Sequence, residues 1–232
     1  MMTVRRSDER GHAEHGWLDS YHTFSFADYY DTEHMNFRAL RVLNEDVVAP
    51  GQGFGTHPHD NMEILTYVID GELEHQDSMG HREVIHAGEV QSMTAGTGIT
   101  HSEYNASATK PVHLVQIWIM PDQRGLKPGY GQRIIPAAEK ANKFRLIAAK
   151  NAGDGALKIN QDTRVYLAEI DAGAKIEHAL DAGRHAWLQV LSGSLTVNGE
   201  TLKAGDAVQV SKETKLTVQG VEKGEILFFD LA

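Results

Sequence analysis

The chain has 232 residues, of which 41% are hydrophobic and 23% charged; its formal net charge is -10 and it has no cysteine. This length suits one large domain or two small ones, each able to bury a core. The acidic balance argues against direct binding to nucleic acid, and the lack of cysteine excludes disulfides, thiolate catalysis and cysteine-ligated metals.

The beginning of the chain carries no secretion signal that we can identify. Residues 1–8 read Met-Met-Thr-Val-Arg-Arg-Ser-Asp and lack the apolar core that such a signal needs. No apolar run approaches the roughly 20 residues that span a bilayer. We therefore expect a cytoplasmic protein without membrane association.

Aromatic side chains gather near the beginning of the chain, among them Trp17, Phe24, Phe26, Tyr29 and Tyr30. They either line a pocket for a small molecule or pack this segment against the rest of the domain. We expect packing, the commoner role of clustered aromatic residues. Trp118 and Trp187 are likewise expected in the core.

Strand-like segments separated by glycine turns dominate the chain. Residues 37–43, 63–69 and 113–120 are rich in β-branched and aromatic residues and are bounded by Gly, Asp, Asn or Pro. Only residues 137–143 suggest a turn or two of helix. Short strands at this spacing predict an all-β sandwich or barrel.

Two pairs of polar residues interrupt this pattern. His57 and His59 are spaced by two, as are His101 and Glu103. Residues i and i+2 of a strand face the same side, so two neighbouring strands would present three imidazoles and a carboxylate to one point. Such nitrogen and oxygen donors suit a divalent transition metal. A hydrogen-bonded histidine cluster is the alternative, but burying imidazoles without charge neutralisation is costly.

The chain has 13 histidines, so most of them are not ligands. We expect surface or supporting roles for His75, His81, His86 and His113. Of these, His75 is the best candidate for orienting a ligand through a hydrogen bond.

The two halves of the chain share a weak internal repeat. In the first, a strand ends at Gly71 and Ala-Gly-Glu at 87–89 opens another; in the second, the corresponding features are Gly193 and Ala-Gly-Asp at 204–206. This rhythm predicts the same sheet motif built twice. We expect two domains, residues 1–135 with the metal site and residues 136–232 without one, because the second half lacks a comparable histidine cluster.

These motifs resemble those of the cupin superfamily. Gly51, His57-x-His59, Glu63 and Gly71 resemble the first cupin motif, and the second is matched by Gly88, Thr94-x-Gly96, His101 and Asn105. Thr94 replaces the usual proline, and two extra residues precede His101. Both departures are similar to those of pirins, a bicupin family, and residues 10–31 resemble the pirin opening signature. The resemblance covers about residues 8–121 and implies two cupin-type double-stranded β-helix (jelly-roll) domains.

The resemblance also implies a ligand set. Pirins hold a metal, usually iron, with the residues that match His57, His59, His101 and Glu103. In other cupins the carboxylate ligand is the one matching Glu63. Strand parity does not decide between the two carboxylates, and the pirin match favours Glu103, with Glu63 beside the site.

The chain is particularly similar to short bacterial pirins described as quercetin 2,3-dioxygenases. This similarity implies a metal-dependent enzyme that cleaves the central ring of flavonols with O2 and releases carbon monoxide. Fe(II) is the expected metal, with Mn, Ni, Co, Cu and Zn as alternatives. Glu103 would both ligate the metal and accept the proton of the flavonol 3-hydroxyl.

A regulatory role is the alternative function. Animal pirins are described as nuclear cofactors that contact transcription factors, so this chain would be an iron-dependent partner of another protein, with incidental flavonol turnover. A monomer is expected. The sequence decides neither the native metal nor the physiological substrate.

Overall fold

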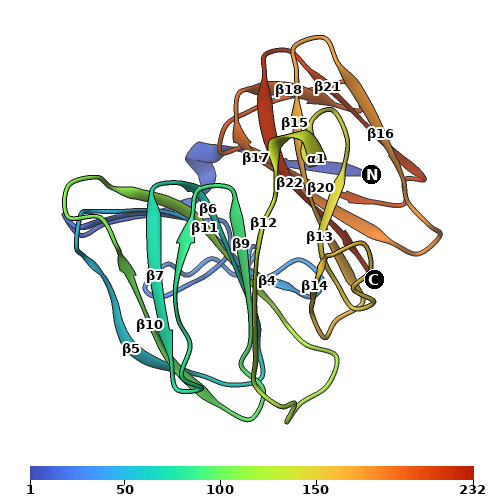
Figure 1. Ribbon diagram of the computed structural model, residues 1–232. Coiled ribbons are helices and arrows are strands. Elements are labelled where there is room, and N and C mark those ends of the chain that lie inside the picture. Colours follow the sequence, from blue (N-terminus) through green and yellow to red (C-terminus); the bar gives the residue numbers. More distant parts are fainter. The chain divides into compact units, whose positions relative to one another are not determined.

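The computed structural model describes residues 1–232, which fold mostly as strands into two compact units (Figure 1). The first β-sandwich comprises Gly11–Ile134 and Leu157–Gln161, and the second comprises Met1–Arg10, Ile135–Ala156 and Asp162–Ala232. Two short segments thus lie on the other side of a single division between residues 135 and 136: Met1–Arg10 belong to the second unit and Leu157–Gln161 to the first. None of the helices has the length and hydropathy required to cross a bilayer.

The first sandwich is built from a large and a small antiparallel sheet. The large sheet has the order β12-β9-β6-β11-β4-β3-β2 and the small sheet the order β5-β10-β7-β8. The strands of the large sheet are β2 (Gly11–Glu14), β3 (Leu18–His22), β4 (Leu40–Val48), β6 (Glu63–Asp70), β9 (Glu89–Thr94), β11 (Val112–Ile119) and β12 (Gly129–Ile134). Those of the small sheet are β5 (Gly53–His59), β7 (Glu72–Asp77), β8 (Arg82–His86) and β10 (Ile99–Asn105). The short β14 (Leu157–Lys158) also belongs to this unit.

The second sandwich repeats this plan. Within this unit the strands of the large sheet follow the order β1-β20-β17-β22-β15-β13, and the small sheet runs β16-β21-β18-β19. The strands of the large sheet are β1 (Met2–Arg5), β13 (Arg145–Ala149), β15 (Thr163–Ile170), β17 (His185–Ser192), β20 (Ala207–Ser211) and β22 (Gly224–Leu231). Those of the small sheet are β16 (Lys175–Ala179), β18 (Ser194–Val197), β19 (Glu200–Lys203) and β21 (Lys215–Gly220). The 3-10 helix η1 (Ser7–Glu9) and the helix α1 (Ala137–Lys140) complete this unit.

The strand β1 comes from the beginning of the chain but belongs to the second sandwich. It pairs with β20, with Met2 opposite Val210 and Arg5 opposite Ala207. In Figure 1 this blue segment lies among orange and red strands. Hydrogen bonding to an edge strand at residues 207–210 explains why Met1–Arg10 belong to the second unit.

The core of each sandwich lies between its two sheets. In the first, Val48 and Val68 of the large sheet cluster with Leu73 and Ile85 of the small sheet. In the second, alternate residues of both sheets form one apolar cluster. Strands with one apolar face bury that face against a second sheet, which is the sandwich the alternating pattern predicts.

The predicted internal repeat is present in the backbone. Gly71 ends β6 with φ 84° and Gly193 ends β17 with φ 72°, a conformation that favours glycine. A Cβ atom would also lie 2.7 Å from the Pro111 carbonyl oxygen at Gly71, and 2.1 Å from that of Lys223 at Gly193. Both hairpins therefore require glycine for the same two reasons.

Two predicted elements differ slightly in their bounds. The strand expected at 37–43 begins only at Leu40, because Phe37 and Leu40 close a tight turn with Arg38 at φ 56°. The helix expected within 137–143 is the single turn α1.

Candidate metal centre

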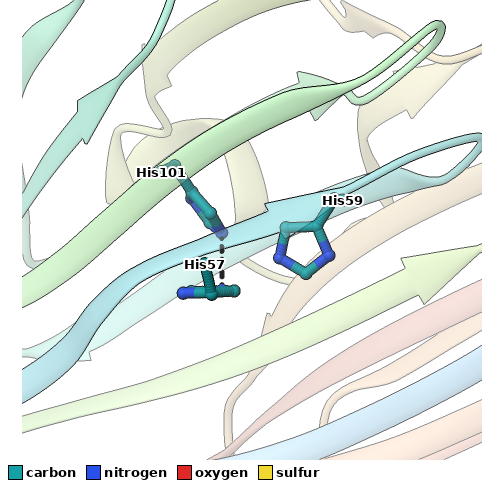
Figure 2. A group of neighbouring side chains, drawn as sticks. All are labelled: His57, His59 and His101. Carbon is teal, nitrogen blue, oxygen red and sulfur yellow. Dashed lines mark hydrogen bonds between the residues drawn. The ribbon is translucent and has the colours of Figure 1, made fainter.

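Three of the predicted ligands, His57, His59 and His101, meet inside the first sandwich (Figure 2). His57 and His59 come from β5, and His101 lies directly opposite His57 on β10. The ring centroids of the three histidines lie 4.4–4.8 Å apart. The spacing of two within β5 and the pairing of β5 with β10 together produce this cluster.

The nitrogen atoms of His57 and His101 have the orientation that a cation requires. Nδ1 of His57 lies 2.7 Å from the carbonyl oxygen of Gly55, to which it donates a hydrogen bond. A neutral imidazole has one N–H, so Nε2 of His57 then carries a lone pair. That atom lies 3.0 Å from Nε2 of His101. Two nitrogens bound at about 2.1 Å to one metal, at right angles, are separated by about 3.0 Å. The donor set therefore fits one divalent metal.

Burial keeps two of these rings neutral. Burial, reinforced by the neighbouring rings, lowers the pKa of both His59 and His101 to about 3. Neutral imidazole is the form that binds metals. The cluster is thus ready to bind a cation at neutral pH without releasing protons from these two rings.

Glu103 joins the cluster through His101. Its carboxylate lies within 4.8 Å of the ligand atoms of both His101 and His75. Glu103 is buried, and burial raises the pKa of its carboxyl group. Gln116 Nε2 donates a hydrogen bond to its Oε2 at 2.8 Å, and the Thr66 hydroxyl approaches its Oε1 at 3.4 Å. A buried carboxylate near three imidazoles balances part of the charge of a divalent cation.

His75 is buried beside His101, where it is suited to orient that ring. Its Nδ1 accepts a hydrogen bond from the amide of Gln91 at 2.9 Å, and its Nε2 lies 3.3 Å from Asp77 Oδ2. Nδ1 of His101 lies 3.5 Å from Nδ1 of His75. The supporting role of His75 stays a prediction, and these contacts are what it would use.

Glu63, the other candidate carboxylate, lies outside both clusters of ligand atoms. It accepts hydrogen bonds from the Thr94 hydroxyl at 2.9 Å and from the Asn160 amide at 3.1 Å. Burial raises its pKa. Its oxygens are therefore engaged with Thr94 and Asn160, which favours Glu103 as the carboxylate of the site.

The other histidines have separate roles. His81 contacts Asp77 at 2.9 Å, His113 contacts Glu45 at 3.0 Å, and His86 is exposed near Glu72. These positions agree with the surface and supporting roles expected for them.

A cavity of about 600 Å³ opens from the cluster and is lined by His57, His59 and Glu103. Phe26 and Tyr29 also line it, so pocket lining, the alternative role for this aromatic segment, applies to both. Trp118 lines the cavity too and, as expected, packs against core residues. Phe24 and Trp187 are buried as expected, Trp17 packs on Phe54, and Tyr30 is exposed. The volume lies within the range of small-molecule pockets.

The polar residues that support the cluster were not among the predicted site residues. Thr66 and Gln116 each stand between apolar residues, and Thr66 lies opposite both Gln91 and Gln116 in the large sheet. Polar side chains on the buried face of a strand need hydrogen-bond partners. That anomaly was the available signal, but the partners depend on strand register.

Two facing sheets in each unit, with a histidine-rich centre in the first, define a bicupin. A family model described as Pirin matches residues 3–119, and one described as Quercetinase C-terminal cupin domain matches residues 146–231. The chain belongs to the pirin family. Both the predicted family and the predicted fold of two cupin-type sandwiches are confirmed.

Individual relatives cover the whole chain. A protein of Escherichia coli (strain K12) named quercetin 2,3-dioxygenase is 49% identical over 231 residues, which span 100% of this chain and 99% of that protein. The crystal structure of YhhW from Escherichia coli matches with a TM-score of 0.97 and 49% identity, covering 100% of this chain and 98% of that one. The structure of bacterial pirin YhhW in complex with nickel(II) matches with a TM-score of 0.95 and 48% identity, covering 100% and 99%.

Proposed function

We propose that this protein is a metal-dependent dioxygenase that cleaves the central ring of flavonols such as quercetin. One O2 is consumed, and one carbon monoxide leaves with the carbon taken from the ring. The observation that carries the proposal is the cluster of His57, His59 and His101, with Glu103 beside it, at a cavity of about 600 Å³. The name of the Escherichia coli relative supports the same activity.

We propose His57, His59, His101 and Glu103 as the residues that hold the metal. Their donors are nitrogen and oxygen only, which suits Fe(II) and also Mn, Ni, Co, Cu or Zn. Fe(II) is our choice for the native metal, and the nickel complex of YhhW supports a divalent cation in this family. When bound, the metal acidifies a coordinated hydroxyl group and provides a position for O2.

Glu103 is the proposed base for the flavonol 3-hydroxyl. Its Oε2 is held by Gln116 at 2.8 Å, whereas Oε1 has only the long contact of 3.4 Å with Thr66. Burial raises the pKa of this carboxyl, which favours transfer of a proton to it. Oε1 is therefore the atom we expect to receive the proton.

The walls of the cavity suit a flat aromatic substrate. Trp118 packs edge-on against His59 at 4.9 Å and against Phe26 at 5.4 Å. Phe54 and Leu18 line the same space. Apolar walls bury an aromatic ring and exclude water from the reacting groups.

The test is reconstitution of the purified protein. Metal is removed by chelation, each of the six metals is added without oxygen, and quercetin and O2 are then supplied. We expect loss of quercetin absorbance with equal uptake of O2 and release of carbon monoxide, fastest with Fe(II). If none of the six metals supports turnover, the proposal is wrong. Elemental analysis of protein purified without added metal identifies the metal it acquires in the cell.

A further inference from the structure

A row of polar side chains, all buried except the half-buried Gln116, crosses the inward face of the large sheet of the first sandwich. Cross-strand pairing places these residues in register from one strand to the next. In spatial order they are Gln91 on β9, Thr66 on β6, Gln116 on β11, Asn44 on β4 and His22 on β3. A polar row through the interior of a sandwich is costly unless each member has a hydrogen-bond partner.

The half of the row near the metal centre has its partners. Gln91 donates to His75, while Gln116 and Thr66 approach the Glu103 carboxylate. The other half differs. Oδ1 of Asn44 and Nδ1 of His22 are buried without any hydrogen-bond partner, although the two side chains are only 2% and 5% exposed. Both residues line the cavity that opens from the metal centre.

The neighbouring row does not share this deficit. Ser20 lies opposite Asp46, two residues from His22 on β3 and from Asn44 on β4. Its hydroxyl donates a hydrogen bond to Asp46 Oδ1. Among the residues that line the cavity, His22 and Asn44 therefore each present a buried polar atom without a partner. Nε1 of Trp118, which also lines the cavity, has no partner either.

Aromatic rings connect this place with the metal centre. Trp118 contacts His59, Phe26 contacts Trp118 at a ring distance of 5.4 Å, and His22 contacts Phe26 at 5.4 Å. A flat ligand held at the histidine cluster would lie along this wall. Its far end would then reach the unpaired polar atoms.

From this arrangement, we infer that His22 and Asn44 form a recognition site for phenolic hydroxyl groups remote from the metal-chelating end of the substrate. The inference rests on the proposed function and adds a determinant of specificity to it. A hydroxyl group both donates and accepts, so it can pair with Asn44 Oδ1 and with His22 Nδ1. A ligand without this hydroxyl leaves both atoms unpaired, which is why such sites discriminate.

The test compares two ligands that chelate in the same way. Quercetin and 3-hydroxyflavone share the 3-hydroxyl and 4-carbonyl groups, but 3-hydroxyflavone lacks all remote hydroxyls. Dissociation constants are measured without oxygen on the nickel-loaded protein, by quenching of tryptophan fluorescence. We expect Asn44→Leu and, separately, His22→Phe to weaken quercetin binding about three- to tenfold, and 3-hydroxyflavone binding less than about twofold.

Thr23→Val is the matched control. Thr23 follows His22 in the chain, and its buried hydroxyl also lacks a partner, but it does not line the cavity. This variant should keep the wild-type preference for quercetin. Thermal unfolding and nickel content verify that each variant is folded and loaded.

The outcomes separate the two proposals. If the wild-type protein binds and turns over quercetin but Asn44→Leu and His22→Phe leave the ligand preference unchanged, the recognition site is wrong and the proposed function stands. Equal weakening of both ligands likewise contradicts recognition of remote hydroxyls. If the loaded wild-type protein binds neither flavonol, the proposed function itself fails.

Discussion

The two sandwiches share a strand order but fill their interiors differently. The small sheet runs β5-β10-β7-β8 in the first and β16-β21-β18-β19 in the second. On the inward faces, β5 and β10 of the first sandwich present His57, His59 and His101. In the second, Ile176 of β16 with Leu216 and Val218 of β21 join the hydrophobic core.

The architecture therefore does not require the polar cluster. In the second sandwich the same strands carry apolar side chains, whose burial is favourable and needs no hydrogen-bond partners. At the corresponding strands the first sandwich has imidazoles and the buried Glu103 beside a cavity. Its polar interior is therefore best explained by binding and chemistry.

Removing His101 should have the largest effect on the metal centre of the first sandwich. His101→Ala should lower metal affinity more than about 100-fold, because even the loss of a supporting partner costs roughly 10- to 100-fold. Flavonol turnover should be lost with the metal. Metal content after dialysis against a weak chelator measures the effect. His86→Ala, at an exposed histidine, is the control and should retain metal; equal retention by both variants would contradict the site.

A substitution in the second sandwich should lower stability without affecting metal binding. Leu216 is fully buried in the apolar core, so Leu216→Ala should lower the free energy of unfolding by about 2–5 kcal/mol. Denaturant titration measures the loss. Metal content per folded molecule should stay at the wild-type level, and a loss of metal would show that the two sandwiches are coupled.

Buried carboxyl groups should give the two sandwiches opposite responses to pH. Burial raises the pKa of Asp46 in the first sandwich to about 7. Between about pH 4 and pH 7 the folded state keeps a proton that the unfolded state has lost, so the free energy of unfolding falls as the pH rises. Asp46→Asn should remove this decline, on the order of a few kcal/mol between pH 5 and pH 8.

Asp230 in the second sandwich provides the contrast. Burial raises its pKa, but hydrogen bonds from His178 and Arg184 outweigh burial and the net pKa is lowered. Its contribution to stability is present above the unfolded pKa and is lost as the pH falls. Asp230→Asn should therefore destabilise the protein at neutral pH. Denaturant titrations of metal-free protein at several pH values check both variants, and parallel wild-type and Asp46→Asn profiles would disprove the assignment.

The two candidate carboxylates of the first sandwich allow a finer test. Glu103→Gln should weaken metal binding at least about tenfold, because it removes the charge that faces His101. Glu63→Gln should leave metal affinity within about twofold, because Glu63 is bonded to Thr94 and Asn160. Competition with a chromophoric chelator measures both affinities. The reverse order would assign the metal to Glu63.

Periodicity and local motifs made much of this structure predictable. The spacing of His57 and His59 placed both on one face of a strand, and Gly71 and Gly193 marked equivalent hairpins. Cross-strand register was not available from the sequence. The inward face of β4 carries Asn44 and Asp46 between Val42 and Val48, yet their position beside His22 and Ser20 depends on pairing with β3. The placement of β1 in the second sandwich depends on pairing with β20, about 200 residues away, which no local pattern reveals.

The placement of β1 has a consequence for synthesis on the ribosome. Residues 2–5 are translated first, but their partners at residues 207–210 emerge near the end. Nearly all of the first sandwich lies within Gly11–Ile134, so it can fold while the rest of the nascent chain is still being made. The opening segment cannot pair with β20 until those residues have been made, so β1 joins the second sandwich late although it is translated first.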